Sequence, residues 1–296
     1  MPLDASLVGV TGGEWSTVVD ARWLMAYAAG IPDEHPSLFD TESLVMHPLF
    51  PVAPEWNALV ATSVTPAAMP ADEVSRGVHV AHDLLIGRPA VAGEVVRVGT
   101  RVVSVDRHRA GAVQTVLVET RDASDALMWR TLFTSLFLGV ELDGEPEEIG
   151  FDWPERPVPP DGDVVAIAVR SSSVSPVAAH VYSECARIWN PIHTDVSAAR
   201  AAGLDAPILH GTATLARAVT AVAELTDTQH ADIGRISCRF GAMVALDSEI
   251  EVRLIHSEAR RHHFDVVTAG GQHAIVDGYL ESFGVDAARP LHEGDE

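Results

Sequence analysis

Residues 182–212 read YSECARIWNPIHTDVSAARAAGLDAPILHGT and contain the sharpest structural signals in the chain. Proline disfavours the helical conformation of the residue before it, so Pro191 must end the helix predicted over 176–187. His193 then follows on a turn just past a helix end, where a side chain can point into a cleft. A further helix is predicted over 211–225. Its first N–H groups, at Gly211 and Thr212, lack partners within the helix and could hold a carbonyl or thioester oxygen.

The same order of elements is predicted in both halves of the chain. A helix over 20–29 or 176–187 is followed by an irregular stretch and a second helical segment over 54–62 or 211–225. Strand candidates rich in Val, Ile, Thr and aromatic residues come next. They are 79–85, 94–106, 114–122 and 127–138 in the first half, and 235–240, 249–256, 262–268 and 272–283 in the second. An early helix followed by an antiparallel sheet, twice over, predicts an α+β duplication.

A weak internal repeat supports this duplication. At an offset of 155, Tyr, Pro and Asp coincide without a gap, and strand-like runs begin together. The coinciding pairs are Tyr27 with Tyr182, Pro36 with Pro191, Asp40 with Asp195, and Glu94 with Glu249. Between the halves, residues 144–163 are rich in proline and acidic residues and predict an extended connector. We therefore expect domains at 1–143 and 164–296, joined by a linker at 144–163.

Composition excludes several classes of protein. The chain has 296 residues, with 20 basic and 42 acidic residues and a net charge of −22; every basic residue is an arginine. Without lysine there is no Schiff-base chemistry and no P-loop, and so acidic a chain is unlike a nucleic-acid binder. Two cysteines give no disulfide framework or zinc spacing. With no signal-peptide start and no membrane-length apolar run, we expect a cytoplasmic protein without a membrane partner.

Two motifs carry a family resemblance. Asn190, Pro191, Ile192 and His193, with Asp195, are followed by the run from Pro207 through His210 to Gly211. This pattern resembles the MaoC-like dehydratase and (R)-specific enoyl-CoA hydratase family, in its double-hotdog form. The resemblance implies two tandem hotdog repeats, each an antiparallel sheet wrapped around a central helix, with a degenerate first repeat. It also implies a pseudo-dimer within one chain, with a homodimer possible and no cofactor or metal.

The resemblance further implies an activity and a site. The reaction is addition of water to an enoyl thioester, or dehydration of a 3-hydroxyacyl thioester, carried by coenzyme A or a carrier protein. His193 is the implied catalytic histidine, Asn190 positions it or the water, and the Gly211 amide polarises the thioester carbonyl. The implied substrate-binding residues around them are Arg187, Ile188, Trp189, His210 and Thr212.

One departure from the family pattern bears directly on the chemistry. The family has an aspartate five residues before the histidine, preceded by glycine, whereas this chain has Ile188 and Arg187. Candidate replacements for the carboxylate are Asp33, which aligns with the missing position, Glu184 and Asp195. Asp195 also fits the N-cap of a short helix over 196–202. The alternatives are therefore a variant enzyme, a non-catalytic acyl-binding module or subunit of a heteromeric dehydratase, and, with less support, a hotdog thioesterase.

Three smaller expectations concern charge and histidines. Phosphates of a carrier would have to be held by arginines, for which Arg88, Arg187, Arg239 and Arg261 are candidates by their position near element ends. His79 and His82 are three apart on a strand, which predicts opposite faces and no metal pair. Residues 260–263 are expected to form an exposed turn.

Overall fold

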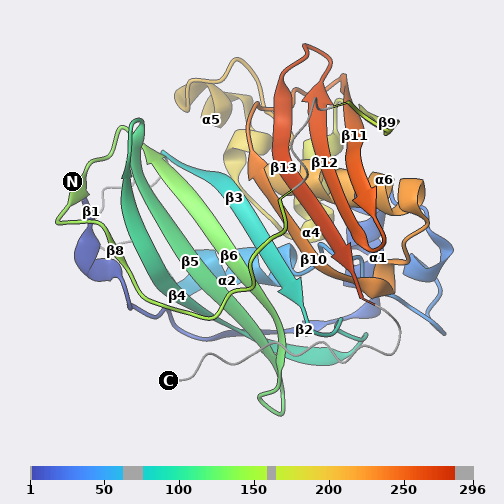
Figure 1. Cartoon of the computed structure of the whole chain (residues 1–296), viewed down its shortest axis with the longest axis horizontal. Helices are drawn as coiled ribbons and strands as arrows, with labels where there is room; N and C mark the ends of the chain where they lie inside the picture. The colour runs from blue at the N-terminus through green and yellow to red at the C-terminus, as the bar shows by residue number, and fades with distance from the viewer. Residues whose placement is uncertain (1, 63–75, 159–164, 284–296) are drawn as a thin grey trace.

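The computed structural model describes residues 2–62, 76–158 and 165–283. Its main feature is one large antiparallel sheet that curves around the helices (Figure 1). The strand order is β2-β4-β5-β6-β3-β10-β13-β12-β11-β9. The strands are β2 (Trp15–Val19), β3 (Gly77–Ile86), β4 (Glu94–His108), β5 (Gly111–Asp122), β6 (Leu127–Leu138), β9 (Ala168–Val174), β10 (Ile233–Phe240), β11 (Ser248–Glu258), β12 (Arg261–Thr268) and β13 (His273–Ser282). The α+β expectation is confirmed.

The two halves of the chain join within this sheet. Strand β3 of the first half pairs antiparallel with β10 of the second, from Leu85 opposite Arg235 to Ala81 opposite Arg239. Main-chain hydrogen bonds therefore cross between the halves, and the sheet has no internal edge at their junction. One hydrophobic core cluster also contains residues of both halves.

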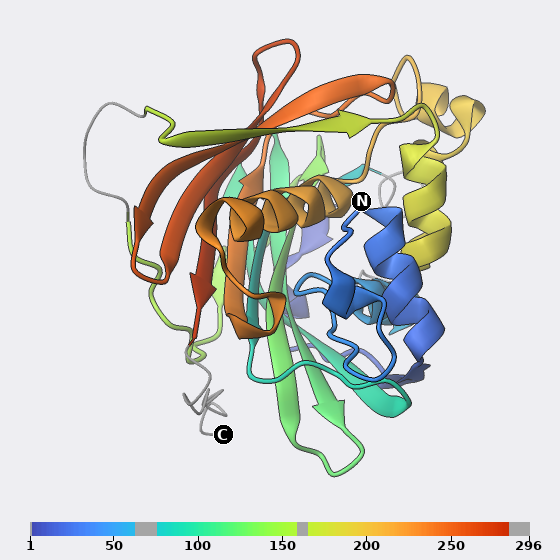
Figure 2. The ribbon, with the colours of Figure 1, turned by 90° about the vertical axis from the view of Figure 1, so that its right-hand side faces the viewer.

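The helices lie on the concave side of the sheet, as Figure 2 shows. Helix α6 (Gly211–Thr226) is buried along its whole middle, from Ala213 to Ala223. Its many alanines let the sheet approach closely on several sides, as expected of a helix in the core. Helices α1 (Ala21–Gly30) and α4 (Ala178–Ala186) pack side by side, and a Cβ at Gly30 would lie 2.8 Å from Cys185 Cβ. The other helices in the described part of the chain are α2 (Val52–Thr62), α5 (Val196–Ala201) and the 3-10 turns η1 (Ala5–Leu7), η2 (Pro36–Leu38), η3 (Pro191–His193) and η4 (His230–Asp232).

The connector and the two residues before it contain short regular pieces. Strand β7 (Leu142–Asp143) pairs in parallel with β1 (Leu3–Asp4), and β8 (Glu147–Glu148) pairs with β4. Trp153 then donates its indole N–H to Asp83 at 3.0 Å. The connector therefore lies against the sheet; residues 159–164 are outside the described part. None of the described helices is both long and apolar enough to cross a membrane.

Two expectations about histidines are wrong. The pairing of β3 with β6 shifts register between His79 and Ala81, and this irregularity brings the His79 and His82 rings to a centroid distance of 5.4 Å. A bulge inserts a residue and so cancels the alternation of faces. His262 and His263, expected in an exposed turn, are both buried within β12.

Candidate active site

The turn between α4 and η3 places the first site residues. Helix α4 ends at Arg187, whose backbone is left-handed at φ 58° and ψ 38°. A glycine adopts this conformation most easily. Asn190 then caps η3 by accepting the Ile192 N–H at 3.3 Å. The chain reverses here, so that His193 at the end of η3 comes to lie beside Ile208.

His193 is held in one orientation by its neighbours. Its Nδ1 lies 2.9 Å from the Ile208 carbonyl oxygen, and its ring stacks on His210 with centroids 3.7 Å apart. A carbonyl oxygen only accepts, so Nδ1 carries the proton and Nε2 keeps its lone pair. Burial lowers the pKa of His193 to about 4, against the opposing effect of the Ile208 hydrogen bond. The side chain is therefore a neutral imidazole at physiological pH, and its Nε2 lone pair is free to accept a proton.

The N-terminus of α6 supplies the second element of the site. Gly211 is the first residue of the helix and is exposed, so its N–H is open to a ligand and aligned with the helix dipole. The Phe240 ring packs on this glycine, and a Cβ there would lie 3.1 Å from Phe240 Cδ1. Thr212 accepts a hydrogen bond from the Tyr182 hydroxyl at 3.1 Å.

His210 lies between these two elements and is 2 % exposed. Its Nε2 is 3.2 Å from Ser183 Oγ on α4, and its ring centroid is 5.0 Å from that of Tyr182. Burial lowers the pKa of His210, which keeps the ring neutral. His210 therefore links α4 to the start of α6 and supports the face of the His193 ring.

The structure does not bring an expected replacement carboxylate to His193. Ile188 is 4 % exposed and belongs to the core. Asp195 caps α5, accepting the N–H groups of Ser197 and Ala198 at 2.6 and 3.2 Å. Glu184 lies on the exposed side of α4, and Trp189 is 56 % exposed. The described residues therefore leave His193 without a neighbouring acid.

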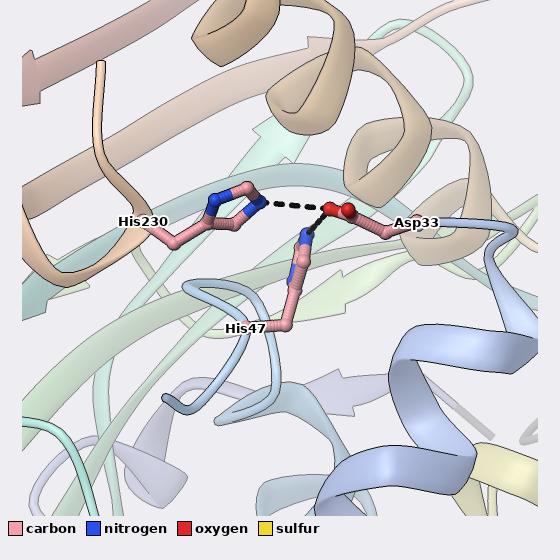
Figure 3. Close-up of side chains that lie close together, drawn as sticks. All are labelled: Asp33, His47 and His230. Atoms are coloured by element: carbon pink, nitrogen blue, oxygen red, sulfur yellow. Dashed lines mark hydrogen bonds and ion pairs between the residues drawn. The ribbon is translucent and has the colours of Figure 1, made fainter. Parts of the chain in front are cut away.

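Asp33, the third candidate, belongs to a different cluster (Figure 3). Its Oδ2 accepts from Thr220 Oγ1 at 2.7 Å and from His230 Nε2 at 2.8 Å, and His47 Nε2 lies 3.7 Å away. Burial alone would raise the pKa of this carboxyl, but the hydrogen bond from His230 and the proximity of His47 outweigh burial and lower it. The ionised carboxylate joins the first half to α6 and η4 of the second. Neither histidine nor Thr220 was anticipated from the sequence.

Asp33, His47 and His230, hereafter the Asp33 cluster, also have the composition of a cation site, because their possible ligand atoms lie within 4.8 Å of one another. The hydrogen bonds argue against that role. His47 Nδ1 accepts the Leu49 N–H at 3.1 Å, so the single proton of a neutral His47 lies on Nε2, the atom that faces Asp33. Donors, not lone pairs, therefore point at the carboxylate, and we interpret the cluster as a buried hydrogen-bond network between the halves.

Buried neutral histidines predict acid-sensitive stability. Burial lowers the pKa of His47 and His82 to about 3, and of His193 and His263 to about 4, from 6.5. The unfolded chain thus binds protons from about pH 6.5 downward, while the folded chain does not until about pH 4. Each histidine is expected to lower the free energy of unfolding by about 1.4 kcal/mol per pH unit in this window. Thermal melts at constant ionic strength from pH 7.5 to 4.5 measure this loss of stability.

His47→Gln provides the control for this prediction. The glutamine amide N–H can still donate toward Thr220 and does not titrate. The unfolding midpoint of this variant should therefore fall less steeply with acid than that of the original chain. Equal midpoints at pH 7.5 and pH 5 in the original chain would contradict the prediction.

All four arginines proposed as phosphate contacts are engaged by carboxylates. A phosphate at any of them would have to displace a partner of the same charge. The pairs are Arg88 with Glu94 at 2.6 Å and Asp122 at 2.5 Å, Arg187 with Asp20 at 3.7 Å, Arg239 with Asp277 at 2.6 Å, and Arg261 with Glu281 at 2.9 Å. Arg187 also lies over the Trp23 ring, 4.1 Å from its centroid.

Fold and site together define a hotdog-type protein with a neutral histidine beside a helix N-terminus. Residues 163–277 match the family model for the MaoC like domain, so the second half of the chain is similar to that family. A MaoC-like dehydratase from Phytophthora capsici shares the fold, with a TM-score of 0.82 and 20 % identity over 96 % of this chain and 99 % of that one. A conserved hypothetical protein from Mycobacterium tuberculosis with a double hotdog fold has a TM-score of 0.64 and 14 % identity, covering 93 % and 95 %. The double-hotdog expectation is confirmed.

A curated relative extends the similarity. The chain is 29 % identical to the peroxisomal multifunctional enzyme type 2 of Drosophila melanogaster over 177 residues, which is 58 % of this chain and 28 % of that enzyme. The full-length structure of the enzyme has a TM-score of 0.77 and 23 % identity, covering 92 % of this chain and 48 % of that one. This chain therefore spans less than half the length of that relative.

Proposed function

We propose that this protein is a hydratase or dehydratase that acts on an enoyl or 3-hydroxyacyl thioester. The observation that carries the proposal is the orientation of His193. Its Nδ1 is hydrogen-bonded to Ile208, which leaves the Nε2 lone pair available, and its ring stacks on His210, the residue that precedes Gly211 at the start of α6. The match of residues 163–277 to the MaoC like domain supports the reaction class. We place this site in the second of two repeats, with boundaries at 1–143 and 164–296.

The proposed reaction needs one base and one oxyanion donor. In hydration, His193 Nε2 takes a proton from water as the water oxygen bonds to C3 of the enoyl chain. The C2–C3 π electrons move toward the thioester, and the charge on its oxygen is met by the Gly211 N–H. The imidazolium then returns its proton to C2, which completes the addition. Dehydration follows the same steps in reverse.

The missing carboxylate defines a direct test of this scheme. Ile188→Asp is expected to raise kcat/KM for hydration of crotonyl-CoA by about 10²-fold, because a second positioned acid or base contributes at least that much. Ile188→Asn is the matched control, with the same shape and no titratable group, and should give no gain. A folded Ile188→Asp protein without any gain would contradict the scheme and favour a different reaction.

The principal alternative is a module that binds an acyl thioester without converting it, or a subunit whose partner supplies the acid. The burial of Ile188 where a carboxylate is expected favours this alternative. A hotdog thioesterase is the weaker candidate. It requires a carboxylate or activated water at the thioester carbon, and the described residues place no acid beside His193.

A further inference from the structure

The inner face of the sheet contains a pair of histidines outside the site described so far. His82 lies on β3 between Phe133 of β6 and Cys238 of β10, at the junction of the two halves. Its neighbours Leu84 and Cys238 belong to the main core, so this face of β3 points inward. His79 stacks on Phe133 with ring centroids 3.8 Å apart. The two imidazoles therefore occupy the concave side of the sheet together.

Three of the four ring nitrogens of this pair have no hydrogen-bond partner in the described part of the chain. They are Nδ1 and Nε2 of His82 and Nε2 of His79, and all three atoms are buried. His82 is only 1 % exposed, whereas His79 has a hydrogen bond with the Ala81 backbone. Buried polar atoms are almost always paired, because leaving one unpaired is costly. Such a cluster on an inward face points to a polar group of a ligand.

This pair is connected to the candidate active site through one aromatic ring. Phe240 lies with its ring 4.8 Å from that of His79, and the same ring packs on Gly211. Exposure decreases along this path, from exposed Gly211 through half-buried Phe240 and His79 to buried His82. A thioester held at Gly211 would therefore lie next to Phe240, and an acyl chain that follows this ring would present its distal part to the histidines.

The chemistry of the pair selects that group. Burial lowers the pKa of His82 to about 3 and lowers that of His79 as well, so both rings are neutral. His79 donates its Nδ1–H to the Ala81 backbone, so its buried Nε2 keeps a lone pair, and neutral His82 has an N–H without a partner in the described part of the chain. A hydroxyl can donate to His79 and accept from His82, and so matches the two histidines, whereas an anion would find no charge to balance it.

We propose that His79 and His82 bind a hydroxyl group carried on the acyl chain of the substrate, beyond the reacting carbons. This inference rests on the proposed function, because it assumes a thioester held at Gly211. It assigns the substrate class as hydroxylated acyl thioesters and gives the first repeat the role of recognising the chain.

The kinetic test compares trans-2-octenoyl-CoA with its 5-, 6-, 7- and 8-hydroxy derivatives. At least one hydroxylated isomer should have a kcat/KM about tenfold or more above that of the plain chain. A factor of this size is expected when a hydrogen bond is supplied to a buried polar group that otherwise has none. His82→Phe should reduce this ratio to about one, and His82→Gln, which keeps a donor and an acceptor, should restore part of it. His108→Phe, on the exposed end of β4, is the control and should leave the ratio unchanged. A ratio near one for all isomers in the original chain would overturn the inference.

Calorimetric titration with saturated octanoyl-CoA and its hydroxylated derivatives separates this inference from the proposed function, because it needs no turnover. Tighter binding of a hydroxylated chain that is lost in His82→Phe supports the pair even if no thioester is converted. Equal affinities overturn it even if hydration is observed. His82→Phe should also raise the midpoint of thermal unfolding by a few degrees, since it removes unpartnered atoms.

Discussion

Replacing His193 with alanine is expected to lower kcat/KM for crotonyl-CoA hydration by about 10²–10⁴-fold, the usual contribution of a positioned acid–base group. The effect should be large because no carboxylate stands beside His193 in the described residues to share the proton transfer. Loss of the enoyl-thioester absorbance measures the rate. The exposed His108→Ala is the matched control and should keep full activity.

Stability is not expected to confound this comparison. His193 is half-buried, and its hydrogen bond to Ile208 joins two surface turns. The His193→Ala protein should therefore fold, which its melting curve can verify. Full activity in a folded His193→Ala protein would remove His193 from the mechanism.

Replacing Gly211 with proline is expected to lower kcat by about 10²–10³-fold, as loss of one oxyanion donor does. Proline removes the N–H while suiting the first position of a helix. The preceding residue, His210, has φ −61° and ψ 141°, a conformation compatible with a following proline. Helix α6 should therefore persist in this variant without the N–H at its first position.

Gly211→Ala is the control for crowding. Its Cβ would meet Phe240 at 3.1 Å, as a proline Cβ would, but the N–H remains. The alanine variant should therefore retain more activity than the proline variant by a factor of ten or more. Equal losses would mean that steric crowding by Phe240, and not the missing donor, explains the effect.

The turns and helix ends of the site could be predicted from the sequence, because each depends on a few neighbouring residues. Pro191 ends α4, Asn190 caps η3 and Gly211 begins α6, and each follows from a steric or capping preference of a few neighbouring residues. The stacking of His193 on His210 has no such signal. It depends on the return of the chain from α5 to Ile208, which brings together rings 17 positions apart in the sequence.

The contacts of the Asp33 cluster could not be predicted from the sequence. Alignment of the halves placed Asp33 at the position of the missing carboxylate, but its partners Thr220 and His230 are 187 and 197 residues away. No local pattern specifies contacts between two domains at such separation. The prediction that His79 and His82 lie on opposite faces is wrong for a different reason. One register shift in β3 reverses the face expected from strict alternation along the strand.

The most direct test of the proposed function is the fate of solvent atoms. Incubation of the protein with crotonyl-CoA in water enriched in ¹⁸O and deuterium, followed by mass spectrometry, locates every atom that enters the product. The account predicts an intact thioester with one solvent oxygen at C3 and one solvent hydrogen at C2, and at least about 10²-fold slower formation of this product by the His193→Ala protein. Solvent oxygen in a free carboxylate would identify a thioesterase, and unlabelled crotonyl-CoA would identify a binding module; either result would contradict the account.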